Sequence, residues 1–410
     1  MNRRMFLGVG AAGVLRADVL PNSRIALGVI GVGWMGLATM KIFMGDPRVQ
    51  IAGICDVDTD HLKEAAEAAP GARTFHEFEE LLSRRDIDAV YMAVPDHWHG
   101  VVAVKALDAG KDVYGEKPLA HSWAEGRAIA EAQSAMKCVW QTGSWQRSLP
   151  DFRYACELVR NGRIGKVTRV EVGLPAGLTD WDGLGNKVES TAPPKTLDWQ
   201  RWLGPAPYAP YCPARVHKTW RWHYDTGGGS LMDWVGHHVD IAHWGLGLDD
   251  SGPISVEGSG EPSPHPIWNT PPRWSVTAKY RGELTMLITG GHDEIRPGTR
   301  WIGSDGWVWV DRSGIDASPQ SLLTSKIRPN EVRLPVTASH HRQFIDCVLT
   351  RQETLTPARV ALRSATPGWL GMVALRTGRV IRWDPVSQAI IGDHAAERVL
   401  RQPMRSPWTI

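Results

Sequence analysis

The chain has 410 residues and a formal net charge of +2 at pH 7. That length is long for one domain and comfortable for two, and a composition of 42% hydrophobic and 22% charged residues indicates a globular rather than a disordered protein. The near-neutral charge without a basic run argues against nucleic acid as a partner, and the five scattered cysteines without a C-x-x-C pair argue against a disulfide framework or a thiolate zinc site.

The first 17 residues have the pattern of an export signal. The twin-arginine pair Arg3-Arg4 precedes the short apolar run GVGAAGVL, and the small residue Ala17 follows it. The run is too short to span a bilayer but fits the apolar core of a signal peptide. Residues 1–17 are therefore predicted to be a Tat-type signal, which would deliver a folded protein to the periplasm without membrane insertion. The alternative is a cytoplasmic protein with a disordered N-terminus.

A strand–turn–helix pattern with a glycine motif comes next. Residues 24–30 form an apolar run typical of a buried strand, and residues 31–36 then read G-x-G-x-x-G ahead of a helical pattern. Glycines at these positions permit a tight turn and let a pyrophosphate approach the N–H groups of a helix N-terminus. The residues of this motif expected to contact a dinucleotide cofactor are Gly31, Gly33, Trp34, Met35 and Gly36.

A second strand-like run, over residues 50–55, ends in Asp56. A carboxylate at that point can accept hydrogen bonds from the ribose hydroxyls of adenosine. No arginine stands immediately beside Asp56 to bind a 2′-phosphate, which favours NAD over NADP. The alternative is that Asp56 only caps its own loop.

Helical and strand patterns continue to alternate, which predicts a parallel sheet. Residues 95–99 are predicted to be a loop at the carboxyl end of a strand, where open α/β sheets bind ligands. The tripeptide E-K-P, residues 116–118, follows the next strand and would place Lys117 beside the nicotinamide half of the cleft, although from pattern alone Lys117 could equally be a surface charge. The expected elements are helices over residues 60–69, 77–83 and 101–109 and strands over residues 89–94 and 112–115.

Together, the glycine motif, the aspartate after the second strand and the E-K-P tripeptide resemble the Gfo/Idh/MocA family, which includes glucose–fructose oxidoreductase and inositol dehydrogenase. The resemblance runs from about Arg24 to Pro385 and is greatest to the exported bacterial subgroup. It implies an α/β fold with an NAD-binding Rossmann domain over residues 24–143 and a second α/β domain over residues 144–385, followed by a tail over residues 386–410. The second domain would contain a large, open, mostly antiparallel sheet, which implies a homodimer or homotetramer.

Patterns in the second part of the chain agree with such a sheet, because several runs are rich in β-branched and aromatic residues. Residues 177–195 are polar and rich in glycine and proline, and they are predicted to be a loop that covers the site. The expected elements are strands over residues 167–174, 274–280, 284–289 and 307–311 and helices over residues 339–349 and 359–377.

The stretch DWVGHHVD, Asp233 to Asp240, is predicted to lie on one helix over residues 231–246. At about 100° per residue, Asp233, His237 and Asp240 fall on one narrow stripe, so that a histidine lies between two carboxylates. Such a line suits a general base whose tautomer is fixed by a carboxylate. A metal site needs three or four converging ligands and this helix offers two, so no metal is expected.

The resemblance assigns roles to particular residues. In family members the lysine of E-K-P and an Asp-x-x-x-His pair share the active site, which here implies Lys117, Asp233 and His237 as catalytic residues. One departure is Val235, because many relatives have glycine at that position. The further residues expected to contact the cofactor are Pro95, His99, Glu116 and Lys117, and those expected to contact the substrate are Trp145, Gln146, Arg147 and Asp240.

The resemblance implies an NAD-dependent oxidoreductase that acts on a secondary hydroxyl of a sugar or sugar-like polyol. His237 would take the hydroxyl proton as hydride leaves the carbon, Asp233 would hydrogen-bond the substrate or the histidine, and Lys117 would stabilise the developing alkoxide. Export would separate the protein from the cytoplasmic nicotinamide pool, so NAD is expected to be held tightly.

Two alternatives to net oxidation stay open. The first is redox-neutral chemistry through a transient keto-sugar, which would end in glycoside cleavage or epimerisation. The second is a non-catalytic NAD-binding sensor. A sensor should have lost part of the catalytic triad, whereas Lys117, Asp233 and His237 are all present.

Overall fold

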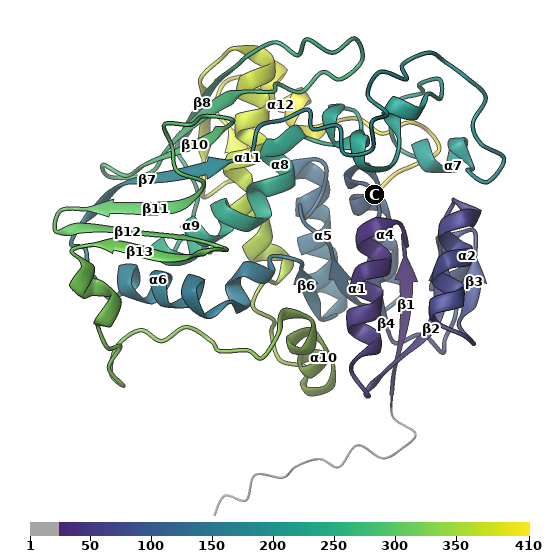
Figure 1. Ribbon diagram of the computed structural model, residues 1–410, viewed down its shortest axis with the longest axis horizontal. Helices are drawn as coiled ribbons and strands as arrows, with labels where there is room; N and C mark the ends of the chain where they lie inside the picture. Colours follow the sequence, from purple (N-terminus) through teal and green to yellow (C-terminus); the bar gives the residue numbers. More distant parts are fainter. Residues whose placement is uncertain (1–23) are drawn as a thin grey trace, which may run out of the picture.

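Two β-sheets organise residues 24–410, the part of the chain that the computed structural model describes (Figure 1). The predicted export signal, residues 1–17, lies outside this part. The first sheet belongs to the N-terminal domain and the second to the C-terminal domain, and they lie on opposite sides of the view in Figure 1. The predicted α/β fold with a Rossmann domain and a second sheet domain is confirmed.

The first sheet has six parallel strands in the order β3-β2-β1-β4-β5-β6. All residues of β4 are buried, as is typical of parallel strands that are covered on both faces. From β1 the chain first builds the sheet in one direction, through β2 and β3, and then crosses to the other side of β1 to form β4, β5 and β6. Such a reversal of strand order creates a crevice between β1 and β4, at the carboxyl ends of the strands. The strands are β1 (Ile25–Ile30), β2 (Val49–Cys55), β3 (Arg73–Phe75), β4 (Ala89–Met92), β5 (Asp112–Gly115) and β6 (Trp140–Thr142), and the helices are α1 (Trp34–Met44), α2 (Thr59–Ala68), α3 (Phe78–Leu82), α4 (Asp96–Asp108) and α5 (Trp123–Met136).

The second sheet has nine strands in the order β13-β12-β11-β7-β10-β9-β8-β14-β15. Only β7 and β10 pair in parallel, so the expectation of a mostly antiparallel sheet is confirmed. Helices α6, α9 and α11 pack against it. The strands are β7 (Val167–Leu174), β8 (Ser255–Gly260), β9 (Trp274–Lys279), β10 (Thr285–Gly290), β11 (Gly298–Gly303), β12 (Gly306–Asp311), β13 (Gly314–Ser318), β14 (Ile381–Asp384) and β15 (Ala389–Ile390), and the helices are α6 (Pro150–Arg160), α7 (Trp199–Leu203), α8 (Gly229–Trp234), α9 (Asp240–Leu246), α10 (His340–Thr350), α11 (Ala358–Thr377) and α12 (His394–Arg401).

The segment over residues 95–99 is helical rather than a loop, so that prediction is wrong. Pro95 is the N-cap of α4, and the helix begins at Asp96. A proline just before a helix has the extended geometry that a cap needs, and an acidic residue in the first turn interacts favourably with the helix dipole. The segment therefore presents a helix N-terminus to the crevice. The predicted loop over residues 177–195, by contrast, contains no helix or strand.

The predicted helix over residues 231–246 is interrupted. Helix α8 ends at Trp234, a π-helical turn covers Val235–Val239, and α9 starts at Asp240. A π turn contains an extra residue, so the regular spacing used to align Asp233, His237 and Asp240 fails across it. The π-helical turn is closely packed: a Cβ added at Gly236 would lie 2.8 Å from the Cβ of Lys117, and Val235 is fully buried.

The C-terminal segment returns to the Rossmann domain. Helix α12 packs against α11 and α5, and the ring of Trp408 lies 4.7 Å from that of Trp98 in an edge-on contact. The backbone N–H of Arg405 donates to the carbonyl of Pro205. In Figure 1 the marked C-terminus accordingly lies beside α4. Among residues 24–410, no helix has the length and apolarity needed to cross a membrane.

Candidate active site

A cavity of about 1110 Å³ lies at the carboxyl ends of the Rossmann strands and reaches α8 and the π-helical turn of the second domain. It brings together residues from both domains that are far apart in the sequence. The predicted site residues that line it are Gly31, Gly33, Trp34, Met35, Gly36, Asp56, Pro95, His99, Glu116, Lys117, Trp145, Asp233 and His237.

The glycine motif has the geometry that a dinucleotide site needs. Gly31 has a φ of +82°, and a Cβ at Gly36 would lie 2.0 Å from the carbonyl oxygen of Gly31, so the turn and the start of α1 pack backbone against backbone. Gly33 caps α1 without a side-chain hydrogen bond, and no acidic residue stands in the first helical turn. The N–H groups at this end of α1 are therefore available to a pyrophosphate.

Asp56 at the end of β2 is tied to the glycine motif. Its carboxylate accepts hydrogen bonds from the backbone N–H of Val32 at 2.7 Å and from that of Asp58 at 2.9 Å. Burial raises the pKa of Asp56, while these two hydrogen bonds act in the opposite direction. Each carboxylate oxygen can accept a further hydrogen bond, so capping of the loop and contact with a ribose hydroxyl are compatible.

Lys117 and Asp233 form an ion pair across the domain boundary. Lys117 Nζ lies 2.8 Å from Asp233 Oδ1 and 2.6 Å from the Asp233 carbonyl oxygen. Arg221, which the sequence reasoning missed, donates from Nε to the same Oδ1 at 3.0 Å. Burial raises the pKa of Asp233, but Lys117 and Arg221 outweigh it and hold that pKa below its ordinary value. Asp233 is therefore ionised, and it fixes the ammonium group of Lys117 at the cavity.

His237 is a neutral imidazole at the cavity wall. Its ring lies between Trp145 and Trp234, whose ring centroids are 6.1 Å and 5.5 Å away. Burial lowers the pKa of His237 well below its ordinary value, and Lys117 and Arg312 lower it further. Its Nδ1 is buried without a hydrogen-bond partner among residues 24–410. The predicted carboxylate partner along the helix is thus not found, but a neutral imidazole is the form that can accept a proton.

Gln146, Arg147 and Asp240 do not line the cavity, and the expectation that they contact substrate is corrected. Arg147 and Asp240 are each 1% exposed and form a bidentate ion pair, with Nε–Oδ2 at 2.7 Å and Nη2–Oδ1 at 2.8 Å. Asp249 accepts from the same guanidinium. A buried charge requires such partners, and this pair joins the turn that carries Trp145 to α9.

Two other expected residues position the walls of the cavity. His99 contacts the carbonyl oxygens of Pro118 at 2.7 Å and Val94 at 2.9 Å, so its ring joins the start of α4 to the E-K-P segment. Burial lowers the pKa of His99 to about 4, while the two carbonyl contacts act in the opposite direction. Glu116 accepts a hydrogen bond from the Tyr91 hydroxyl at 3.1 Å, and burial raises its pKa.

Asp96 is a further ionisable residue that sequence reasoning did not single out. It stands in the first turn of α4, lines the cavity and is 4% exposed. Burial raises the pKa of Asp96 to about 8, Arg221 lowers it and Asp233 raises it. The carboxyl group is therefore largely protonated near neutral pH and can donate a hydrogen bond into the cavity.

Arg312 also lines the cavity and was missed, because residues 307–311 were recognised only as a strand. It lies in the turn between β12 and β13, with its guanidinium carbon 4.6 Å from the ring centroid of Trp145 and 4.9 Å from that of Trp234. No spacing motif links residue 312 to the other site residues, so only the folded chain reveals it.

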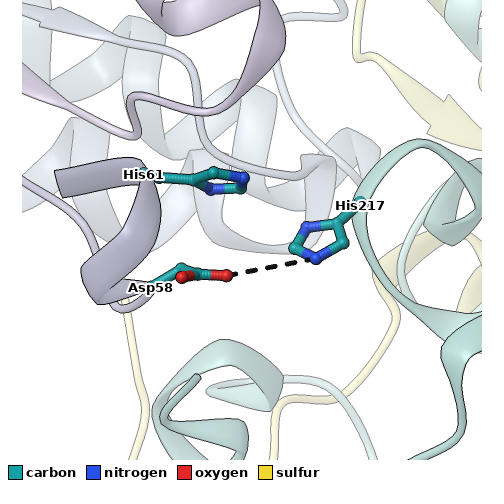
Figure 2. Close-up of side chains that lie close together, drawn as sticks. All are labelled: Asp58, His61 and His217. Atoms are coloured by element: carbon teal, nitrogen blue, oxygen red, sulfur yellow. Dashed lines mark ion pairs between the residues drawn. The ribbon is translucent and has the colours of Figure 1, made fainter. Parts of the chain in front are cut away.

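Asp58, His61 and His217 form the one group among the described residues that could hold a metal ion (Figure 2). Their ligand atoms lie within 4.8 Å of one another. Asp58 already caps α2 by accepting from the Asp60 N–H at 3.0 Å, and its contact with His217 is 4.0 Å long. His61 lies against Gly33. These side chains thus form part of the wall around the glycine motif, and the absence of a metal centre stays a prediction.

The combination of a parallel-sheet domain, an accessible glycine motif, an acidic strand end and a lysine at one cavity defines a dinucleotide-binding oxidoreductase fold. The chain belongs to the Gfo/Idh/MocA oxidoreductase family: residues 25–144 match its NAD-binding Rossmann fold, and residues 152–410 match its C-terminal alpha/beta domain. The family assignment made from the motifs is thereby confirmed, as is NAD as the cofactor of this domain, and the geometry around α1 and Asp56 fits that cofactor.

Several proteins of known name are similar to this chain over part of its length. An inositol 2-dehydrogenase of Corynebacterium glutamicum (strain R) is 32% identical over 145 residues, which are 35% of this chain and 43% of that protein. A glycosyl hydrolase family 109 protein of Stenotrophomonas maltophilia (strain K279a) is 26% identical over 229 residues, 50% of this chain and 48% of that protein. The matches therefore span about half or less of these relatives.

Among solved structures, the WlbA dehydrogenase of Bordetella pertussis, in complex with NADH and UDP-GlcNAcA, superposes with a TM-score of 0.66. The sequence identity is 20%, and the match covers 88% of this chain and 99% of that one. At this identity the likeness shows the shared fold.

Proposed function

We propose that the protein is an NAD-dependent oxidoreductase that oxidises a secondary hydroxyl of a sugar or sugar-like polyol. One observation carries this proposal. His237, a neutral imidazole, and Lys117, a charged ammonium paired with Asp233, line the same cavity as the glycine motif and Asp56. A proton acceptor and a hydrogen-bond donor thus lie where a substrate would meet the bound dinucleotide. The likeness to an inositol 2-dehydrogenase supports a polyol-like substrate.

Each residue has a distinct role in this reaction. NAD, when bound, supplies the acceptor for the hydride that leaves the carbon bearing the hydroxyl. His237 accepts the hydroxyl proton, because its imidazole is neutral. Lys117 directs an N–H at the substrate oxygen and stabilises the negative charge that develops there. Asp233 and Arg221 act through Lys117, since they hold the ammonium group in place.

A second candidate is redox-neutral chemistry, in which a transient keto-sugar leads to glycoside cleavage or epimerisation. Two observations favour it: the likeness to a glycosyl hydrolase family 109 protein, and the sequence pattern of an export signal. An exported enzyme must regenerate its cofactor within its own site, which requires tightly held NAD. A homodimer or homotetramer belongs to the same proposal, with the open sheet as its interface.

The experiment begins with the purified protein, denatured without added cofactor, and quantifies the nucleotide released. The protein is then incubated with NAD and a panel of sugars and polyols while the absorbance of reduced nicotinamide is followed. Turnover that disappears in Lys117→Ala and His237→Ala, but persists in the surface control Lys105→Ala, supports the proposal. Binding of NAD without turnover on any member of the panel, or turnover that survives in both site variants, contradicts it and favours a non-catalytic sensor.

The redox-neutral candidate has its own test. An aryl glycoside is incubated with the protein and no added cofactor. Two results together would favour glycoside cleavage over net oxidation as the reaction. Wild type would release the aryl alcohol while Lys117→Ala does not, and the denatured sample would contain close to one NAD per chain. No release from a protein that binds NAD reversibly would exclude it.

A further inference from the structure

The cationic side chains of the cavity differ in how they are paired. Lys117 and Arg221 pair with Asp233 at 2.8 and 3.0 Å. Lys218 pairs with Asp182 at 2.6 Å, and Arg201 pairs with Glu77. Among the Lys and Arg residues of the described chain that line this cavity, Arg312 is the one for which the structure shows no ion pair or hydrogen bond. Its charge is therefore available to a ligand.

Arg312 is exposed to solvent, but two aromatic rings restrain its side chain. Its guanidinium lies 4.6 Å from the ring of Trp145 and 4.9 Å from that of Trp234, so it contacts two aromatic rings from different elements. Cation–π contacts of this kind restrict a long flexible side chain while leaving the N–H groups at its edge free. A guanidinium that is fixed and unpaired is pre-organised to bind an anion, because less rotamer entropy is lost on binding.

The same two tryptophans also flank the proposed base. Trp145 and Trp234 lie 6.1 and 5.5 Å from the ring of His237. Arg312 and His237 thus share both aromatic neighbours, and both line the cavity. A sugar whose hydroxyl meets His237 would bring its other substituents within reach of Arg312.

We propose that Arg312 binds an anionic group carried by the substrate, a carboxylate or a phosphate, so that the enzyme prefers acidic sugars over neutral ones. The five N–H donors of a guanidinium form a planar fork that matches either group in a bidentate manner. Arg312 is in this view a specificity residue, whereas His237 and Lys117 carry out the reaction. The inference rests on the proposed oxidation of a sugar hydroxyl.

The test compares matched substrates and matched variants. Glucuronate, glucose 6-phosphate and glucose differ in the group at one end of the same ring, and each is assayed for kcat and KM with wild type, Arg312→Gln and Arg312→Lys. The control is Arg296→Gln, because Arg296 also stacks on a tryptophan, Trp309, but pairs with Asp316 and does not line the cavity. Calorimetric titration of each sugar into the NAD-loaded protein gives a readout that does not depend on turnover.

We expect wild type to favour at least one acidic sugar over glucose by roughly tenfold or more in kcat/KM, as one charge-assisted bidentate contact allows. Arg312→Gln should lose this preference through a raised KM for the acidic sugar, and Arg312→Lys should recover only part of it because the planar fork of N–H donors is lost. If the preference for glucuronate is lost in Arg312→Gln, the anion is a carboxylate. If the preference for glucose 6-phosphate is lost, the anion is a phosphate.

The outcomes separate this inference from the proposed function. Equal kcat/KM for glucose and both acidic sugars in wild type, or an unchanged KM in Arg312→Gln, would overturn the role of Arg312 while leaving sugar oxidation intact. If no sugar is oxidised but an acidic sugar binds wild type and not Arg312→Gln, the anion site stands and the oxidation fails. If no acidic sugar binds or reacts, the inference is wrong.

Discussion

Lys117 contacts Asp233 twice, through the side-chain carboxylate at 2.8 Å and through the backbone carbonyl at 2.6 Å. One ammonium group therefore joins the E-K-P segment of the Rossmann domain to the end of α8 in the second domain. Two of its N–H groups are used in this way, which leaves the third for substrate. The domain boundary and the proposed reaction centre are thus held together by the same side chain.

Replacing Asp233 with asparagine should uncouple this arrangement. Lys117 and Arg221 would lose a shared, buried anionic partner, so the free energy of unfolding should fall by about 3 kcal/mol, and kcat should fall roughly 100-fold or more because Lys117 is no longer fixed. Urea unfolding and steady-state kinetics measure both effects. A variant with unchanged kcat would show that the ion pair has no part in catalysis.

The difference in unfolding free energy between wild type and Asp233→Asn should depend on pH in one direction only. The folded-state pKa of Asp233 lies below its unfolded value of about 3.9. The contribution of the pair to stability is therefore complete above that value and is lost only as the pH falls further. The gap in unfolding free energy between wild type and Asp233→Asn should stay constant from about pH 8 to about pH 5 and shrink below about pH 4.

The acidity of His237 can be followed through the pH profile of kcat/KM. Burial, Lys117 and Arg312 lower its pKa well below its ordinary value, so the base is already neutral at mildly acidic pH. The profile should show no loss of activity with an apparent pKa near about 6.5, the value of an unperturbed histidine. His237→Asn should lower kcat by roughly 100-fold or more. An acidic limb centred near the unperturbed value would contradict the assigned environment.

Two glycines of the motif should respond differently to alanine. A Cβ at Gly33 would meet only the His61 ring, at 3.4 and 3.5 Å, whereas one at Gly36 would lie 2.0 Å from the Gly31 carbonyl oxygen. Gly33→Ala should keep the unfolding temperature of wild type but weaken NAD binding, since the methyl group stands where the pyrophosphate approaches. Gly36→Ala should lose stability and NAD binding together. Thermal unfolding and NAD titration distinguish these cases, and equal NAD affinity in Gly33→Ala and wild type would argue against a pyrophosphate there.

Asp240 and Asp249 provide a paired test of the buried ion cluster around Arg147. Asp240 is 1% exposed and makes a bidentate contact, whereas the side chain of Asp249 is 26% exposed. Asp240→Asn should lower the free energy of unfolding by about 3 kcal/mol, and Asp249→Asn should lower it by less. Neither variant should raise KM at a temperature where it is folded. A large rise in KM in Asp240→Asn, with unchanged stability, would show that Asp240 contacts the substrate.

Local patterns predicted the parts of the fold that depend on neighbouring residues. The apolar runs of β1, β2 and β4, the glycine motif and the aspartate at the end of β2 all follow from short-range chemistry, and the structure places them as expected. Helix α4 was predicted to start too late, because the cap at Pro95 is a subtler signal than the apolar pattern that follows it.

Long-range packing determined the features that the sequence did not reveal. The π-helical turn at Val235–Val239 accompanies the close approach of Gly236 to Lys117, which are far apart in the sequence. Regular helical spacing therefore placed Asp240 beside His237, although it pairs with Arg147 instead. Arg221 and Arg312 stand in segments without any recognisable motif, and their contacts with Asp233 and with the tryptophans exist only in the folded chain.

The contact of Trp408 with Trp98 has a consequence for the order of events during synthesis. Trp98 belongs to α4, the helix whose first turn borders the cavity, and the ring of Trp408 packs edge-on against it. The ribosome must therefore have translated the chain as far as Trp408 before α4 obtains its final neighbours. Trp98 also lines the cavity, so the packing behind this part of its wall is completed only when the segment around Trp408 has joined the fold.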